Sequence, residues 1–211
     1  MYNKSVLLGT DAEAISILLK IHAYVNPLIL DVTYNTGKIW KGLPCKLVKM
    51  DISGDLENLD IIADFKQIPF KDECFDVIVF DPPHLPTNAA SANSSKIWEK
   101  QYGLTNEGFG REGDNVCGMF LPFLLEAKRV LKKNGIILAK IADIVHNHKY
   151  QWQQVYYIIE CINVGLTPCD MLIKCDPKGG NLKSSKWKNV KHLKRSHAYW
   201  VVTRKGKCEK P

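Results

Sequence analysis

The segment CFDVIVFDPPH, residues 74–84, joins an apolar run to a short polar end that could do chemistry. The run is rich in β-branched residues and too short for a typical helix, which predicts a buried strand. Asp81 can accept hydrogen bonds, and the pair Pro82 and Pro83 fixes the direction of a backbone carbonyl. His84 adds a flat imidazole that can stack or form a hydrogen bond. Together these residues can hold a flat group that carries N–H donors.

Three further aspartates, each at or near the end of a predicted strand, repeat this arrangement. They are Asp31, Asp51 and Asp64. In an open parallel sheet, ligands bind beyond the carboxyl ends of the strands. One such acid would mean little, but four after four successive strands form a pattern. A carboxylate at a strand end can accept both hydroxyls of a ribose, so the pattern indicates a ligand that contains a nucleoside.

The elements that position these residues alternate between strand and helix patterns. Buried strands are predicted at 28–33, 46–50, 59–63, 75–80, 135–142, 170–175 and 197–204. Helices are predicted at 11–25 with Asp11 as cap, at 115–133 with LKKNG as stop signal, and at 150–163. This alternation predicts one α/β domain over residues 1–211, with a mostly parallel sheet and helices on both faces.

Two motifs carry a resemblance to a known family. The segment DVTYNTG, 31–37, resembles the DPFxGxG loop, and DPPH resembles the D/N/S-P-P-Y/F/W signature of class I S-adenosylmethionine-dependent amino-methyltransferases. The resemblance covers about residues 28–143. It implies a Rossmann-like sheet of about seven strands, S-adenosyl-L-methionine as cofactor and no metal. The chain departs from the family at Asn35, where glycine is usual, and at His84, where an aromatic residue is usual. Asn tolerates positive φ, so the loop can still form.

The resemblance also implies roles for individual residues. The loop would contact the methionine part of the cofactor, Asp51 the ribose, and Asp64 with Phe65 the adenine. The predicted cofactor-binding residues are Asp31, Thr33, Tyr34, Gly37, Asp51, Ile52, Asp64 and Phe65. The predicted catalytic residues are Asp81, Pro82, Pro83 and His84.

Methylation of an aryl amine is difficult because the nitrogen lone pair is delocalised into the ring. Asp81 can accept one N–H and the carbonyl of Pro82 another, so that the nitrogen becomes more tetrahedral. His84 would stack on the target base. Positioning and electrostatics then supply most of the catalysis.

A polyanionic acceptor is indicated by the charge distribution. The formal net charge is +7, and the stretch 178–207 contains ten Lys or Arg without one Asp or Glu. Basic and aromatic residues in the long segment 85–114 and in the basic segment 177–196 suit phosphates and bases. The predicted substrate contacts are Lys96, Trp98, Tyr102, Arg111, Lys186 and Lys188. The predicted acceptor is the amino group of a nucleic-acid base, adenine N6 of DNA ahead of cytosine N4.

Several alternatives stay open at this point. An RNA base amino-methyltransferase would use the same motif, and protein glutamine has a similar acceptor group. A non-catalytic nucleic-acid-binding subunit would account for His84 and for the single glycine in DVTYNTG. A dehydrogenase is disfavoured, because its phosphate-binding loop needs more glycines. Oligomeric state is left undecided.

Cellular location and cysteine chemistry are predicted from what the sequence contains. No apolar run has the length of a membrane span or a signal peptide, which favours a soluble cytoplasmic protein. The seven cysteines have no compact spacing and are expected to be reduced thiols. A zinc site formed by Cys161, Cys169 and Cys175 with His192 or His197 is a weak alternative, since no CxxC pair supports it.

Overall fold

The central feature of the fold is a single large sheet. A computed structural model describes residues 4–83, 116–146, 149–176, 193 and 195–208. Within these residues, eight strands form the sheet in the order β1-β9-β10-β6-β5-β2-β3-β4. They are β1 Val6–Leu8, β2 Leu28–Asp31, β3 Lys46–Asp51, β4 Ile61–Ile62, β5 Phe75–Phe80, β6 Leu131–Ile141, β9 Thr167–Cys175 and β10 His197–Arg204. A separate hairpin is formed by β7 Ile144–His146 and β8 Lys149–Gln151.

Most strand pairs in the sheet are parallel. The strands β4, β3, β2, β5 and β6 are parallel neighbours, and β1 is parallel to β9. Only β10 runs the other way, antiparallel to both β6 and β9. The predicted Rossmann-like α/β class is therefore confirmed, with β1 as an additional edge strand beyond the seven expected.

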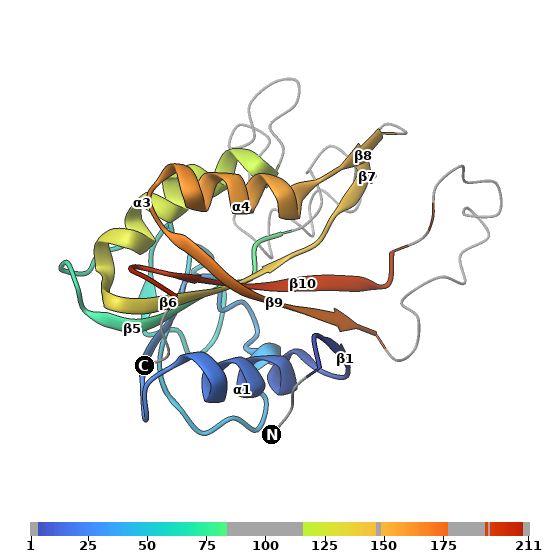
Figure 1. The fold of residues 1–211 in the computed structure, drawn as a ribbon. Helices are drawn as coiled ribbons and strands as arrows, with labels where there is room; N and C mark the ends of the chain where they lie inside the picture. The colour runs from blue at the N-terminus through green and yellow to red at the C-terminus, as the bar shows by residue number, and fades with distance from the viewer. Residues whose placement is uncertain (1–3, 84–115, 147–148, 177–192, 194, 209–211) are drawn as a thin grey trace.

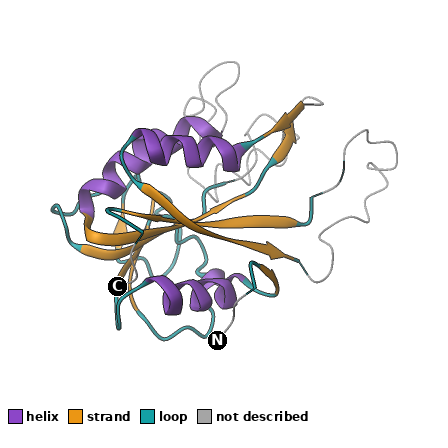
Figure 2. Ribbon diagram, in the orientation of Figure 1, coloured by secondary structure: helices purple, strands orange, loops and turns teal. Residues whose placement is uncertain are grey.

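Helices cover both faces of the sheet, as Figures 1 and 2 show. The helix α1, Asp11–His22, lies on one face with the 3-10 helix η1, Lys38–Trp40. The helices α3, Phe120–Val130, and α4, Gln153–Asn163, lie on the other, with the 3-10 helix η3, Val116–Met119, before α3. No α-helix of the described residues is long and apolar enough to cross a membrane.

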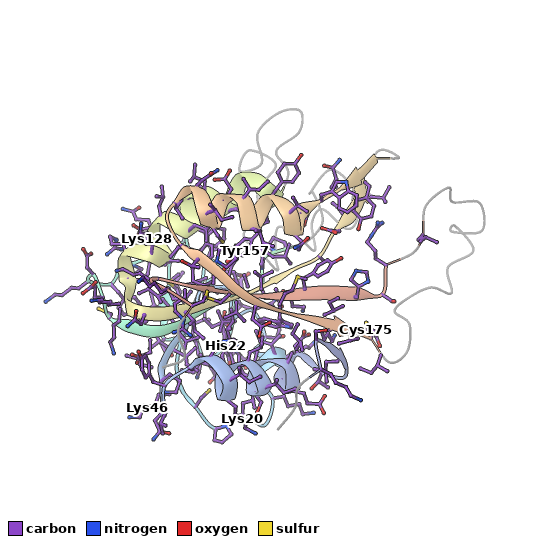
Figure 3. The ribbon with its side chains drawn as sticks, in the orientation of Figure 1. Lys20, His22, Lys46, Lys128, Tyr157 and Cys175 are labelled. Atoms are coloured by element: carbon purple, nitrogen blue, oxygen red, sulfur yellow. A yellow bond between two sulfur atoms is a disulfide. The ribbon has the colours of Figure 1, made fainter. Side chains whose placement is uncertain are left out.

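Two apolar cores form because alternate side chains of each strand point to opposite faces. Val77, Leu138 and Trp200 pack with the inner side of α1. Phe80, Ala139 and Val201 pack against α3 and α4. Figure 3 shows Tyr157 on the sheet side of α4, where it is fully buried.

Helix α1 begins at Asp11 as predicted but ends at His22 instead of residue 25, and its N-cap lies one residue earlier than expected. The predicted cap was Asp11, but the cap is Thr10, whose hydroxyl accepts a hydrogen bond from the backbone N–H of Glu13. The Glu13 carboxylate in turn accepts from the Thr10 backbone N–H, which completes a capping box. Asp11 is thereby available for the interaction with Lys140 described below.

The prediction of a helix through 115–133 is wrong at its end. Helix α3 ends at Val130, and LKKNG belongs to β6. Leu131 pairs with Phe75 of β5, and Asn134 takes a positive φ of 63°. A Cβ on Gly135 would overlap the Leu131 side chain, so this glycine permits close packing at the start of the strand and does not stop a helix.

The prediction that all cysteines are reduced is also wrong. Cys169 of β9 and Cys208 after β10 form a disulfide, with 5.5 Å between their Cα atoms. The antiparallel pairing of β9 and β10 brings these residues together across 39 positions of sequence. Neither spacing nor composition marks them as a pair.

Candidate functional site

The four aspartates predicted to share one edge of the sheet do so. Asp31 and Asp51 are the last residues of β2 and β3, and Asp81 directly follows β5. Asp64 lies two residues beyond β4. Because β4, β3, β2 and β5 are consecutive parallel neighbours, their carboxyl ends lie along the same edge.

Asp31 is fully buried at the base of this edge. Its Oδ2 accepts a hydrogen bond from Trp40 Nε1 at 2.6 Å, and its Oδ1 accepts from the Thr33 backbone N–H at 2.9 Å. Burial is the main cause that raises the pKa of Asp31 to about 7; the hydrogen bonds from Trp40 and Thr33 act against this shift, and the carboxylates of Asp81 and Asp51 add to it. The two hydrogen bonds to Asp31 fix the start of the DVTYNTG loop.

The pKa of Asp31 predicts a specific dependence of stability on pH. The folded carboxyl group keeps its proton up to about pH 7, whereas the unfolded group loses it near the ordinary pKa of 3.8. The unfolded state is therefore favoured increasingly as pH rises between these values, and the effect is complete above pH 7. The stability of Asp31→Asn relative to wild type should improve by up to about 4 kcal/mol between about pH 4 and pH 8.

Urea titrations at several pH values would check this prediction. Asp55→Asn, at an exposed position, is the matched control for the loss of one carboxyl group. A difference between Asp31→Asn and wild type that stays constant with pH would contradict the pKa of Asp31.

The DVTYNTG loop has the backbone conformation that its sequence predicts. Asn35 adopts a φ of 50° at the position where the related motif has glycine, and Gly37 adopts a φ of 66°. The backbone N–H of Asn35 donates to Asp51 Oδ2 at 2.8 Å, which ties the loop to the end of β3. The Asn35 Oδ1 atom is buried and accepts no hydrogen bond from the described residues. A buried amide oxygen without a donor is a position where a ligand N–H or ammonium group would be stabilised.

Substitution of Gly37 should destabilise the loop. Alanine there would combine a positive φ with a Cβ that overlaps the ring of Tyr34. Gly42→Ala is the matched control, since Gly42 has a φ of 78° but a Cβ there would meet no atom within 4 Å. Gly37→Ala should lower the free energy of unfolding by about 2 kcal/mol or more, and Gly42→Ala by about 1 kcal/mol. Equal losses in denaturant titrations would show that the contact with Tyr34 is unimportant.

Asp51 is positioned by the backbone on both sides of it. Its Oδ1 accepts from the Ser53 N–H at 3.0 Å, in addition to the bond from Asn35 to Oδ2. Burial raises the pKa of Asp51, although these backbone donors act against the shift. A carboxylate accepts about four hydrogen bonds, so capacity for a ligand hydroxyl is left. The neighbouring Ile52 is 38% exposed and offers an apolar surface beside it.

Asp64 and Phe65 are arranged differently from each other. Asp64 is half-buried, and its Oδ1 accepts from the Lys66 N–H at 2.9 Å. Phe65 is only 9% exposed and packs edge-on against Phe80 and Phe123, with centroid distances of 5.3 and 6.2 Å. The ring of Phe65 thus belongs mainly to the core beneath the edge, and only a small part of it faces a ligand there.

Thr33 connects the loop to the DPP segment. Its hydroxyl accepts a hydrogen bond from the Asp81 backbone N–H at 2.8 Å. Pro82 and Pro83 are both buried, so the backbone after β5 is held by packing as well as by proline geometry. Tyr34 lies in the same loop, and its N–H donates to the Met50 carbonyl at 3.0 Å.

Lys140 of β6 was missed in the sequence and lies beside Asp81, on the strand next to β5. Its Nζ is 3.1 Å from Asp81 Oδ2 and 3.1 Å from Asp11 Oδ2. The three side chains are 15–19% exposed. Burial lowers the pKa of Lys140, but the two carboxylates outweigh burial and the net shift is upward. Lys140 is therefore an ammonium group held beside Asp81.

Asp11 anchors this lysine to helix α1. Asp11 also accepts from Trp200 Nε1 at 3.1 Å and lies 3.6 Å from Lys174 Nζ. The one sequence feature that could have indicated Lys140 is its position as the only charged residue in the apolar run GIILAKIA. Its partners could not be found from spacing, because 129 positions separate it from Asp11 and 59 from Asp81.

The chain is similar to known proteins in structure and not in sequence. No protein-family model and no curated protein sequence matches the chain. A protein of Bacillus halodurans, provisionally assigned as a methyltransferase, is similar in structure, with a TM-score of 0.55. The two sequences are 14% identical, and the match covers 93% of this chain and 100% of that chain. A provisionally assigned methyltransferase in complex with the Haloferax volcanii Trm112 methyltransferase activator has 14% identity, coverage of 92% and 88%, and a TM-score of 0.53. The chain has the Rossmann-like methyltransferase fold.

A structure of a provisionally assigned DNA modification methylase from Thermus thermophilus is less similar. It has 12% identity and a TM-score of 0.46, and 77% of this chain is covered. This chain spans only 56% of that protein.

Several predicted site residues lie outside the part of the chain that the structure describes. They are His84, Lys96, Trp98, Tyr102, Arg111, Lys186 and Lys188. Among the residues that are described, no group of three or more His, Cys, Asp or Glu side chains could hold a metal ion. The alternative zinc site also loses Cys169, which is in the disulfide.

Proposed function

We propose that this protein is an S-adenosylmethionine-dependent methyltransferase that acts on an exocyclic amino group of a nucleic-acid base, with adenine N6 of DNA ahead of cytosine N4. The observation that carries the proposal is the DPP segment at the carboxyl edge of a methyltransferase fold, where Lys140 holds the Asp81 carboxylate. Two loops that suit a nucleoside cofactor lie on neighbouring strands of the same edge.

The residues of this edge fit S-adenosylmethionine. The buried Asn35 Oδ1 and the Asp51 carboxylate are acceptors for its ammonium and ribose hydroxyl groups. Ile52 and the exposed part of Phe65 would contact the adenine, and the Asp64 carboxylate would accept a hydrogen bond from the adenine amino group. When bound, the cofactor supplies a methyl group on a positively charged sulfur. The chain itself supplies the position of the acceptor and the charge around it.

The acceptor amine is activated by hydrogen bonds that withdraw its lone pair from the ring. One N–H of the exocyclic amine would donate a hydrogen bond to the Asp81 carboxylate, and the second N–H would donate one to the carbonyl of Pro82. The Lys140 ammonium keeps Asp81 in its charged form, in which it only accepts hydrogen bonds. The positive charge that develops on the nitrogen is then stabilised by the same carboxylate.

A nucleic acid is the acceptor that the charge of the chain favours. The formal net charge is +7, and the predicted contacts in 85–114 and 177–196 are basic and aromatic. A base in a duplex must be flipped out of the stack or presented in a single strand to reach Asp81. RNA bases carry the same amino groups, so RNA is the second acceptor class that the test must include.

Transfer of a tritiated methyl group from S-adenosylmethionine would test the proposal. The acceptors would be native duplex DNA, heat-denatured DNA, total RNA and a protein extract. The proposal predicts label in DNA. Label in RNA alone would change the polymer but retain the base amine. Label in protein alone, or cofactor binding without transfer to any acceptor, would contradict the proposed activity of the isolated chain.

A further inference from the structure

A cluster of aromatic and cationic side chains lies beyond the four strands that end at or near aspartates, near the start of helix α4. Tyr150 of β8 and Trp152 have ring centroids 4.4 Å apart at a tilt of 46°. The Arg195 guanidinium carbon lies 4.7 Å from the centroid of the Tyr150 ring. Trp152 is 56% exposed, a large fraction for an indole. These three residues, Tyr150, Trp152 and Arg195, are called the aromatic platform below.

The aromatic platform is held in place by a buried carboxylate. Asp143 is only 4% exposed. Its carboxylate accepts hydrogen bonds from the Tyr150 hydroxyl at 2.9 Å and from the Gln154 backbone N–H at 3.0 Å. Tyr150 is therefore fixed at its hydroxyl end, and helix α4 begins directly after Trp152. A ring fixed before a ligand arrives loses little conformational entropy when the ligand binds.

The aromatic platform lies at the same edge of the sheet as Asp81. Strand β10 begins at His197, two residues after Arg195, and its Tyr199 and Trp200 pair with Ile141 and Lys140 of β6. Asp143 follows the end of β6 by two residues. Figure 1 shows the β7–β8 hairpin projecting at the end of the sheet where β10 begins. Lys140 bonds to Asp81, so one strand, β6, links the DPP segment to the aromatic platform.

We propose that the aromatic platform binds an unpaired nucleotide of the nucleic-acid substrate, adjacent to the acceptor base. The base would stack on the exposed Trp152 ring, and the Arg195 guanidinium would contact the phosphate. Stacking on aromatic rings next to a cation is the usual way in which proteins hold single strands without sequence preference. This inference rests on the proposed function, because it assigns a second contact for the same substrate. An unpaired nucleotide is present in single-stranded DNA and in RNA alike.

Fluorescence anisotropy with a short labelled oligonucleotide would test this inference without any methyl transfer. The probes would be single-stranded DNA, RNA of the same sequence and the DNA duplex. Trp152→Ala should raise Kd for the single strands about tenfold, whereas Trp152→Phe retains a stacking ring and should change it little. Arg195→Lys should weaken binding although the charge is kept, because a lysine does not stack on Tyr150 in the same way.

The matched control is Tyr24→Ala, which removes another exposed aromatic ring, 44% accessible, just after the end of α1. It should leave Kd unchanged. The inference would be overturned if Trp152→Ala and Arg195→Lys bound the oligonucleotides with the wild-type Kd. The proposed function would still stand if the same variants transferred methyl groups to a nucleic acid with the wild-type KM. Dependence of oligonucleotide binding on Trp152, with methyl label found only in protein, would overturn the proposed function and retain the aromatic platform. A wild-type protein that binds none of the three probes would overturn both.

Discussion

Asp81→Asn is expected to lower the rate of methyl transfer about a thousandfold and to leave the Kd for S-adenosylmethionine nearly unchanged. Asparagine has almost the same shape but lacks the negative charge that stabilises a nitrogen becoming positive, and interactions of this kind are worth about 10²–10³ in rate. The cofactor residues proposed at Asn35 and Asp51 belong to neighbouring strands and need no contact with Asp81. Single-turnover rates and calorimetric titration of the cofactor would separate the two effects.

The matched control for Asp81→Asn is Asp170→Asn. Asp170 also contacts a nitrogen-bearing side chain, since its Oδ2 lies 2.9 Å from His22 Nε2. It is the strand partner of Val202, toward the opposite edge of the sheet. It should keep the wild-type rate. An Asp81→Asn variant that turns over at the wild-type rate would remove the DPP segment from the mechanism.

Lys140→Met is expected to reduce both the rate of transfer and the stability of the fold. Lys140 is the ammonium shared by Asp81 and Asp11, and breaking a buried ion pair by removing one partner costs about 3 kcal/mol or more. The rate should fall about a hundredfold, because the position and charge of Asp81 would no longer be fixed. Denaturant titration and single-turnover kinetics would measure the two losses.

The pH dependence of the rate distinguishes a role in positioning Asp81 from a purely structural role of Lys140. Without the neighbouring ammonium group, Asp81 should bind a proton more readily, so the acid limb of the pH–rate profile should move to higher pH. Lys140→Arg keeps the charge and should return the limb toward its wild-type position. A profile unchanged in Lys140→Met, with stability alone reduced, would make Lys140 a structural residue.

Two features set by local sequence were predicted correctly. The aspartates at strand ends follow from the short apolar runs before them, which are typical of buried strands in a parallel sheet. The positive φ of Asn35 follows from the tolerance of asparagine for that conformation. The end of helix α3 was misjudged because LKKNG has the composition of a helix C-terminus but belongs to strand β6, whose Leu131 pairs with Phe75 of β5.

Features that depend on tertiary contacts could not be predicted. The ion pair between Lys140 and Asp11 requires helix α1 to pack across β6, and no local pattern encodes that contact. The burial of Phe65 against Phe80 and Phe123 likewise depends on where α3 lies. The candidate site therefore has a predictable part, the strand ends, and a second part formed by contacts between distant segments.

Nucleoside analysis of a methylated acceptor would identify the atom that receives the methyl group. DNA and RNA would be incubated with the protein and methyl-labelled S-adenosylmethionine, digested to nucleosides and separated by chromatography with mass detection. The proposed function predicts that the label is found in N6-methyladenine or N4-methylcytosine, and that Asp81→Asn abolishes this labelling. Label on a ring carbon, as in 5-methylcytosine, or on a ribose hydroxyl would contradict the assignment of the DPP segment as the site that holds an exocyclic amine.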